Sequence, residues 1–279
     1  MSDTAACATP SDHLTEENLS HVVWRLAWPS VLTMLLQFAN GLVDMFFVGR
    51  LGPAAQATVG MGGQVVMMLL SLSMAVTTGA TAIVARYVGA SDRAGAAEAA
   101  RQALLLSALL SLLIGLPLWL MRRTVLGWMG AAPEVLPDGT AYLAITTLAI
   151  TPYFLLLTYI AVFQALGDMR TPLAIMVVVN GSNILLDALL IGGWGPVSAL
   201  GVRGAAIASS SARVAGALLA AFWLARRGFW LSAAAEWQPP MEWAVRILRI
   251  GMPAALQAAL RSIGAVSYTH LTLPTILRV

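Results

Sequence analysis

Long apolar stretches alternate with short polar connections along almost the whole chain. Stretches of about 20 apolar residues are long enough to cross the hydrocarbon core of a bilayer as helices. The pattern predicts seven such helices, at residues 24–48, 58–84, 99–121, 141–166, 172–192, 204–225 and 245–266. The runs are continuous and rich in Leu and Ala, whereas the strands of a membrane barrel alternate in polarity over about 10 residues. We therefore expect an all-α integral membrane protein.

Composition supports this expectation. Hydrophobic residues make up 59% of the 279 residues and charged residues only 10%, and the mean hydropathy is +0.80, whereas a soluble domain carries about 25% charged residues. The net charge of +3 comes from arginines scattered among the connections, which argues against a nucleic-acid interface. The single cysteine, Cys7, excludes an internal disulfide framework.

The chain divides into five segments. Residues 25–30 (RLAWPS) and 249–254 (RIGMPA) share an Arg, an aliphatic residue, a small residue and a Pro in the same order. Such internal repeats are common in transporters and suggest that a second half begins near Glu242. The apolar pattern stops after residue 266, so the rest is interpreted as a foreign tail, the alternative being an unusual native C-terminus. The expected segments are a polar leader (1–21), a six-helix lobe (22–227), an interlobe loop (228–244), the start of a second lobe (245–266) and the tail (267–279).

Arginine placement predicts the orientation in the membrane, because cytoplasmic connections carry an excess of basic residues. The leader lacks the basic-then-apolar layout of a signal peptide, so the first helix is expected to be retained. With the N-terminus in the cytoplasm, the inner side holds Arg25, Arg86, Arg93, Arg101, Arg170, Arg226, Arg227, Arg246 and Arg249, and the outer side holds only Arg50, Arg122, Arg123 and Arg203. We expect a cytoplasmic N-terminus.

Two acidic residues, Asp44 and Asp187, lie inside apolar runs, while the other eleven of the 13 acids lie in the leader, the connections or the membrane edges. An acid at membrane depth costs a few kcal/mol or more, so protonation, a bound cation, a basic partner or a water-filled cavity must offset that cost. Each acid ends a polar stripe with the spacing i, i+3, i+7 on one helix face. The stripes are Gln37, Asn40 and Asp44 on the first helix and Asn180, Asn183 and Asp187 on the fifth.

The matching stripes predict an ion site between the two helices. Amide and carboxylate oxygens suit a proton or a small hard cation such as Na⁺, although amides also simply join helices in membranes. The histidines lie outside the predicted spans, so no metal cluster is expected.

Other residues inside the predicted spans have several possible roles. Arg213 is the one basic residue well inside a span, and it could pair with Asp187, contact a substrate or extend toward an interface. Pro29 and Pro152 remove backbone hydrogen bonds and permit bending. Met-rich and aromatic positions, Tyr159 among them, could line an apolar cavity, but packing against lipid is the expectation favoured for them.

Several segments together resemble the multidrug and toxic compound extrusion (MATE) antiporters, within the wider group that includes polysaccharide flippases. Besides Pro29, the similar segments are VDMFFVGRLG at 43–52, QALGDMRTP at 164–172, NILLD at 183–187 and GVRGAAIA at 201–208. Their order and spacing match the family over roughly residues 20–266.

The resemblance implies a fold of twelve helices in two six-helix lobes, with a central substrate cavity and export coupled to H⁺ or Na⁺. It also implies a cation site in the first lobe at Asp44, Asn183 and Asp187, with a helix-six Thr whose counterpart here is Ser209. Gln37, Asn40, Asn180, Arg213, Pro29 and Tyr159 are then candidates for lining or supporting the cavity. The chain would hold the first lobe and a truncated seventh helix.

The function expected from this resemblance is cation-coupled export of amphipathic or cationic organic compounds from a bacterial or archaeal cell by a monomeric protein in its inner membrane. The expected partners are these substrates and membrane lipid, with no cofactor beyond the coupling ion. Two alternatives are a flippase for lipid-linked saccharides, which would want a more cationic cavity, and a membrane enzyme such as a prenyltransferase, which would need an Asp-rich cluster. We do not expect an enzyme.

Overall fold

The structure is a computed structural model that describes residues 19–193, 198–227, 241–257 and 260. Every regular element in these ranges is an α-helix. The helices are α2 (Leu19–Gly49), α3 (Pro53–Gly89), α4 (Arg93–Trp128), α5 (Leu136–Leu148), α6 (Ile150–Ala165), α7 (Arg170–Leu190) and α8 (Gly201–Arg226). Residues 241–257 form a further helical segment. The prediction of an all-α protein is confirmed.

Five of the described helices, α2, α3, α4, α7 and α8, are long and apolar enough to cross a membrane, and α5 and α6 meet the same criteria when they are taken together as one bent span. These spans occupy the places of the first six predicted segments; α3 and α4 extend several residues further at both ends, whereas α6 and α7 end one and two residues before the predicted ends. The seventh predicted segment, 245–266, lies partly outside the described residues, as do most of the predicted leader and interlobe loop and the whole of the tail.

The fourth predicted span, 141–166, corresponds to two helices, α5 and α6, with a bend between them. The axes of α5 and α6 differ by 46°, and the break lies at Ala149. Pro152 explains the position of the break, because it has no N–H to donate to the carbonyl of Leu148 and its ring crowds that carbonyl. The bending that the sequence allowed for at Pro152 is therefore present.

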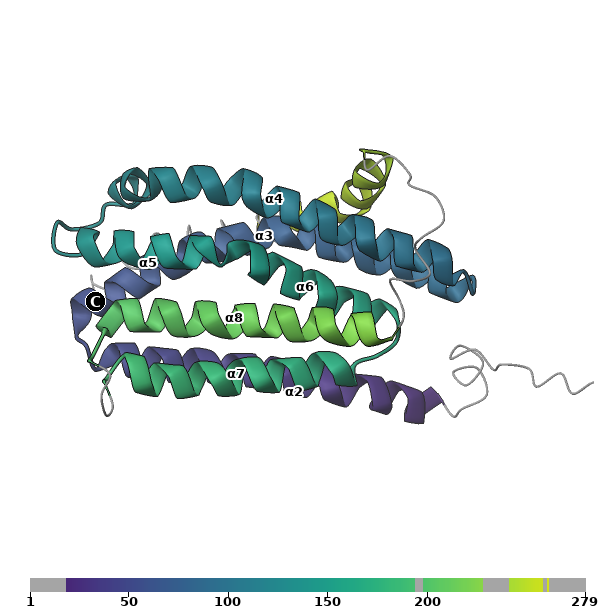
Figure 1. Cartoon of the computed structure of the whole chain (residues 1–279), viewed down its shortest axis with the longest axis horizontal. Helices are drawn as coiled ribbons and strands as arrows, with labels where there is room; N and C mark the ends of the chain where they lie inside the picture. Colours follow the sequence, from purple (N-terminus) through teal and green to yellow (C-terminus); the bar gives the residue numbers. More distant parts are fainter. Residues whose placement is uncertain (1–18, 194–197, 228–240, 258–259, 261–279) are drawn as a thin grey trace, which may run out of the picture.

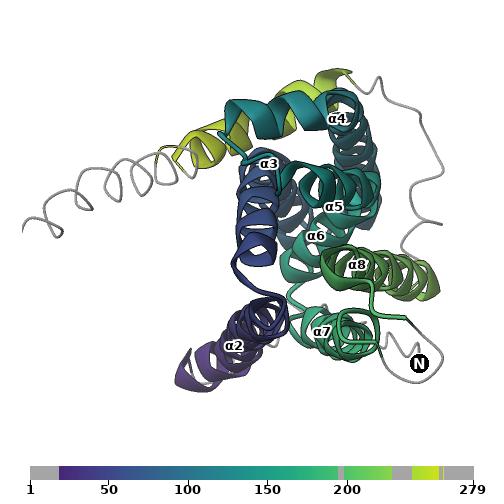
Figure 2. The ribbon, with the colours of Figure 1, turned by 90° about the vertical axis from the view of Figure 1, so that its left-hand side faces the viewer.

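The helices lie roughly along one axis, as Figure 1 shows, and the end view in Figure 2 places α2, α7 and α8 beside one another. α7 makes its most extensive contacts with α8 and also packs on α2, whereas α3 packs on α4 and α6. The starts of α2, α4 and α7 lie at the same end of the bundle as the ends of α3, α6 and α8 (Figure 1). This is the arginine-rich end, for which the sequence predicts a cytoplasmic location.

Small residues allow α7 and α8 to approach closely. A Cβ added at Gly204 would lie 2.5 Å from the carbonyl oxygen of Leu190, and one at Gly216 would lie 2.4 Å from Val179 Cγ2. Small residues at such positions are the usual means of close helix packing in membranes, where apolar side chains gain little from burial against each other. The close approach holds the polar stripe of α7 beside α8.

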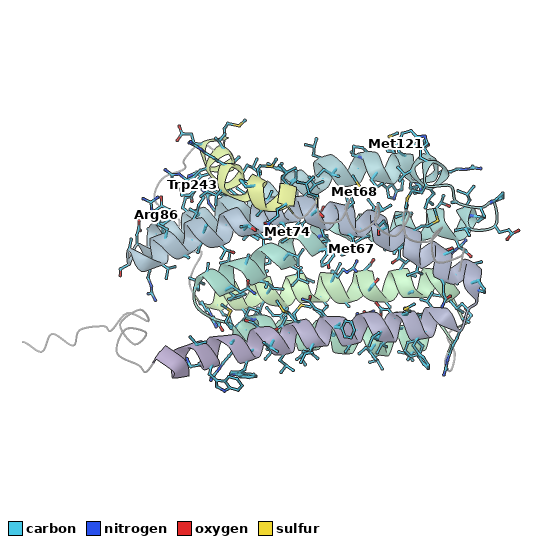
Figure 3. All side chains as sticks on the ribbon, turned by 180° about the vertical axis from the view of Figure 1, so that it is seen from behind. Met67, Met68, Met74, Arg86, Met121 and Trp243 are labelled. Atoms are coloured by element: carbon cyan, nitrogen blue, oxygen red, sulfur yellow. The ribbon has the colours of Figure 1, made fainter. Side chains whose placement is uncertain are left out.

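The helical segment 241–257 lies against α3 and closes one side of the core. Trp243 and Ile247 are buried in the main cluster of apolar side chains, and Figure 3 shows Trp243 beside the end of α3 that carries Arg86. A Cβ at Gly79 would collide with the backbone of Ile247. These contacts do not test whether the segment begins a second lobe, so that assignment stays a prediction.

Candidate functional site

A hydrogen bond between two amides joins the polar stripes of α2 and α7. Asn40 Nδ2 donates to Asn183 Oδ1 at 2.8 Å. Asn183 Nδ2 in turn donates to Asp187 Oδ2 at 3.0 Å, and Asn40 Nδ2 lies 3.4 Å from Asp44 Oδ2. The two stripes that the sequence pattern placed on separate helices therefore form one connected polar network.

The two intramembrane acids, Asp44 and Asp187, lie one turn beyond the amide bridge. Asp187 is 1% exposed, and Asp44 is half-buried. Their carboxyl groups are within hydrogen-bonding reach of each other. Two carboxylates this close cannot both stay ionised without a compensating charge, because they repel each other strongly in a medium of low dielectric constant. A shared proton or a cation between them removes that repulsion.

The amide bridge forms part of the wall of a large cavity. The cavity has a volume of about 950 Å³ and is lined by residues from α2, α3, α6, α7 and α8. Its polar lining includes Gln37, Asn40, Ser71, Ser73, Thr77, Thr78, Thr81, Gln164, Asn180, Asn183, Ser209 and Arg213, while Met, Leu, Ile, Val, Ala, Gly and Tyr residues supply the rest. Neither acid is among the lining residues, so the network of amides lies between the cavity and the carboxyl pair.

The remaining members of the predicted site lie around the same cavity. Asn180 is buried, and its Nδ2 has no partner among the described residues. Gln37 is exposed on the wall formed by α2. Ser209 also lines the cavity, but its hydroxyl donates to the carbonyl of Ala205 at 2.9 Å and has no hydrogen bond to the amide network within the described ranges. Ser209 thus keeps an oxygen lone pair for a ligand without belonging to the network.

Arg213 lies over an aromatic ring, and an ion pair with Asp187, one of its possible roles, is absent from the described part of the structure. Its guanidinium carbon is 4.2 Å from the centre of the Tyr153 ring, a cation–π contact. Arg213 lines the cavity and is near enough to Asp44 to act on it electrostatically. Of the alternatives that the sequence left open for Arg213, the described residues show no ion pair with Asp187, and contact with a substrate stays open.

The structure also shows where the other residues proposed to line or support the cavity lie. Tyr159 packs beside the apolar core rather than lining the cavity. Pro29 is buried within α2, where its carbonyl accepts a hydrogen bond from Thr33 Oγ1 at 2.8 Å. Met67 and Met74 line the cavity, on the exposed side of α3 seen in Figure 3. Lipid-facing packing was the expectation for these methionines, and it does not hold for these two.

Three residues near the site carried no signal in the sequence. Tyr142 is 8% exposed and lies within electrostatic range of both acids. Ser210 is buried with no partner for its hydroxyl in the described residues, and Tyr153 holds Arg213. A lone Tyr or Ser in an apolar helix has no distinctive spacing, so only the packing of α5, α6 and α8 identifies these side chains.

The oxygens of the carboxyl pair and the amide network suit a proton or a small monovalent cation. Asn40 Oδ1 and Asp44 Oδ1 are buried without a hydrogen-bond partner among the described atoms, and hard cations prefer such oxygen ligands. In the described ranges no three His, Cys, Asp or Glu side chains come together to hold a metal ion. The carboxyl pair and the neighbouring amide oxygens are groups that can take a proton or coordinate Na⁺.

Residues 29–189 match the model of the MatE family. Among curated proteins, the chain is 25% identical over 249 residues to "Probable multidrug resistance protein NorM" of Thermotoga maritima, covering 89% of this chain and 54% of that protein.

Solved structures agree with this match. The chain is similar to an outward-facing multidrug resistance MATE family transporter of the MOP superfamily, with a TM-score of 0.83, 27% identity and coverage of 93% of this chain and 57% of that one. It is also similar to the Vibrio cholerae MATE transporter VcmN in its bent form, with a TM-score of 0.82, 26% identity and coverage of 91% and 57%. The chain spans about half the length of the relatives it matches.

Proposed function

Because the chain belongs to the MatE family, a family of transporters, we propose that it forms the ion-coupling half of a transporter that exports small organic molecules. The family places it among membrane transporters, and the geometry of α2, α7 and α8 supports a more specific role. In this role the cavity receives an amphipathic or cationic compound, and the adjacent carboxyl pair receives the coupling ion. The resemblance to transporters of prokaryotes supports a location in a bacterial or archaeal inner membrane, and the arginine distribution supports a cytoplasmic N-terminus.

One observation carries the proposal: the hydrogen bond of 2.8 Å between Asn40 and Asn183 links the acid-bearing helices at the cavity wall. When H⁺ or Na⁺ binds between Asp44 and Asp187, the repulsion between the carboxylates is removed and α2 and α7 are held together. When the ion leaves, the repulsion favours separation of the two helices. An ion that binds one arrangement better than the other shifts the population toward it.

The cavity is adjacent to this switch and has the size of a binding site for a drug-sized molecule. Its volume of about 950 Å³ lies within the range of about 300–1,000 Å³ that ligand pockets occupy. Met67, Met74 and Tyr153 offer an adaptable apolar and aromatic surface, which suits substrates of varied shape. Because α2 and α7 form part of the wall, a change in their separation alters the cavity directly.

We assign the coupling ion to Asp44 and Asp187, with Asn183 as the neighbouring amide ligand. Ser209 is the proposed hydroxyl ligand, since it lies on the same cavity and its oxygen can accept while its proton is donated to Ala205. Gln37, Asn40 and Asn180 supply polar contacts between the cavity and the ion. Either H⁺ or Na⁺ satisfies this arrangement.

A lipid-linked saccharide flippase receives less support from the cavity. Arg213 is the one charged residue in its described lining, and it is already stacked on Tyr153. A pyrophosphate-linked substrate calls for several basic groups. The prenyltransferase alternative needs clustered acids for Mg²⁺, and the family assignment favours a transporter over an enzyme.

Dye efflux from proteoliposomes tests the proposal, using a two-lobe protein whose first lobe is this chain. We expect Asp187→Asn to abolish efflux driven by an imposed H⁺ or Na⁺ gradient, because the carboxyl pair is then lost. Asp138→Asn is the matched control, since Asp138 is exposed and lies 3.8 Å from Arg203 at the surface. Gradient-driven efflux that persists in Asp187→Asn at the level of the control contradicts the proposal.

A further inference from the structure

A second hollow lies at the arginine-rich end of the bundle, where α7 begins and α8 ends (Figure 1). It has a volume of about 390 Å³ and is lined by Arg170, Thr171, Ala174, Trp223, Arg226 and Arg227. The hollow is separate from the cavity beside the amide bridge, and no residue lines both. Three of its six lining residues are arginines, so it is a basic pocket between two helices.

The positive charge of this pocket is only partly neutralised. Arg227 Nη2 lies 2.5 Å from Asp168 Oδ2, and the same carboxylate caps α7 by accepting from the backbone N–H groups of Arg170 and Thr171 at 3.0 Å. Arg226 stacks on Phe222, with 4.8 Å between its guanidinium carbon and the ring centre. Asp168 thus pairs with the guanidinium of Arg227, while among the described residues no carboxylate lies within ion-pair distance of Arg170 or Arg226.

The pocket also lies at the edge of the surface that faces lipid. Phe222 on α8 is 51% exposed, and Val177 on α7 is 50% exposed. Apolar side chains exposed on membrane-spanning helices contact acyl chains, and Trp at a helix end such as Trp223 is typical of the interface with the headgroups. A molecule with a negative headgroup and acyl tails would fit both parts of this surface.

We propose that the pocket binds the phosphate headgroup of an anionic phospholipid, with Arg170 and Arg226 as its principal ligands. Guanidinium groups donate paired hydrogen bonds to phosphate oxygens, and basic pockets between spanning helices at the cytoplasmic side bind anionic headgroups. The acyl chains lie along the apolar surface of α7 and α8. Headgroup binding there fixes the start of α7, the helix that carries Asn183 and Asp187.

Titration of the purified full chain in detergent with phosphatidylglycerol, followed by native mass spectrometry, tests this proposal. The double variant Arg170→Gln/Arg226→Gln is expected to bind phosphatidylglycerol roughly tenfold or more weakly, since each basic group near an anionic headgroup contributes measurably to binding. Arg122→Gln/Arg123→Gln is the matched control, because it removes the same charge at the opposite end of the bundle. If the control variant binds phosphatidylglycerol as tightly as the unaltered chain does, the result supports the pocket as the lipid-binding site.

Three results would overturn the proposal. Phosphatidylcholine could bind as tightly as phosphatidylglycerol, the control could lose as much affinity as the pocket variant, or inorganic phosphate at equal concentration could displace the lipid and so identify free phosphate as the ligand. Arg170 and Arg226 are exposed, so the variant should fold, and far-UV circular dichroism checks this. If the double variant does not fold, Arg226→Gln alone is titrated with the same expected direction, and unchanged affinity then overturns the proposal.

Discussion

A double-mutant cycle measures how much the amide bridge between α2 and α7 contributes to the free energy of unfolding. The single variants are Asn40→Ala and Asn183→Ala, and each removes the hydrogen bond of 2.8 Å that joins the helices. Asn183→Ala also removes the donor to Asp187 Oδ2 at 3.0 Å. We therefore expect Asn183→Ala to lower the free energy of unfolding by roughly 1–3 kcal/mol, because a buried acceptor loses its partner. The effect of Asn40→Ala should be smaller.

The coupling energy of the pair is the decisive quantity. Interhelical hydrogen bonds in membranes contribute about 0.6 kcal/mol on average and up to about 1.7 kcal/mol, and this partly buried bond of 2.8 Å should lie within that range. Unfolding of the purified chain in mixed micelles with increasing dodecyl sulfate, followed by circular dichroism, gives the four free energies.

Gln37→Ala is the control for the cycle. Gln37 shares the cavity wall on α2 but is exposed, so its loss should change stability by less than about 0.5 kcal/mol. A coupling energy between Asn40 and Asn183 that is zero within error would refute the bridge.

Three further predictions follow from close packing, capping and cavity charge. Gly204→Ala should lower the free energy of unfolding by roughly 1–3 kcal/mol, because its Cβ would lie 2.5 Å from a backbone carbonyl oxygen. The control is Gly181→Ala, whose Cβ would meet nothing within 4 Å and which should not be destabilising. Equal losses of stability in the two variants, measured by thermal unfolding, would contradict this prediction. Burial opposes ionisation of Asp168, but hydrogen bonds from Thr171 and Arg227 outweigh it and hold the pKa of this carboxyl below its ordinary value. Its contribution to stability is present at neutral pH and is lost as the pH falls through that lowered pKa. The cost of Asp168→Asn, up to about 1 kcal/mol at pH 7 for a partly exposed ion pair, should therefore vanish in strong acid, and a pH-independent cost would argue against it. Arg213→Gln should tighten binding of cationic dyes several-fold by removing a repulsive charge from the cavity, measured by fluorescence polarisation, and weaker binding would show that Arg213 contacts these ligands favourably.

Much of the helical arrangement was predictable because a bilayer demands long apolar runs with satisfied backbone groups. The acids were predictable for the same reason, since Asp44 and Asp187 are costly unless something compensates them. The equal spacing of the two stripes pointed to a pair of facing helices, and the Asn40–Asn183 hydrogen bond shows that they do face each other.

Other features depend on packing that no local pattern records. The ends of α3 and α4 extend beyond the apolar runs because polar, capped turns continue the helix outside the hydrophobic segment, as at Asp92, whose carboxylate accepts from Gly95 N–H at 2.8 Å. The sequence left three roles open for Arg213, and only the register of α6 and α8 shows that its guanidinium lies over the face of Tyr153. The proximity of Tyr142 to the acids likewise follows from how α5 sits against α8.

Infrared difference spectroscopy of the carboxyl groups tests the ion site most directly, and it can be carried out on the purified chain. The account predicts that raising the pH, or adding Na⁺ if that is the coupling ion, removes a carbonyl stretching band of a protonated carboxylic acid. This band should be absent from Asp187→Asn and unchanged in the surface control Asp138→Asn. A difference band that is the same in both variants and in the unaltered chain would contradict the assignment of the coupling ion to Asp44 and Asp187.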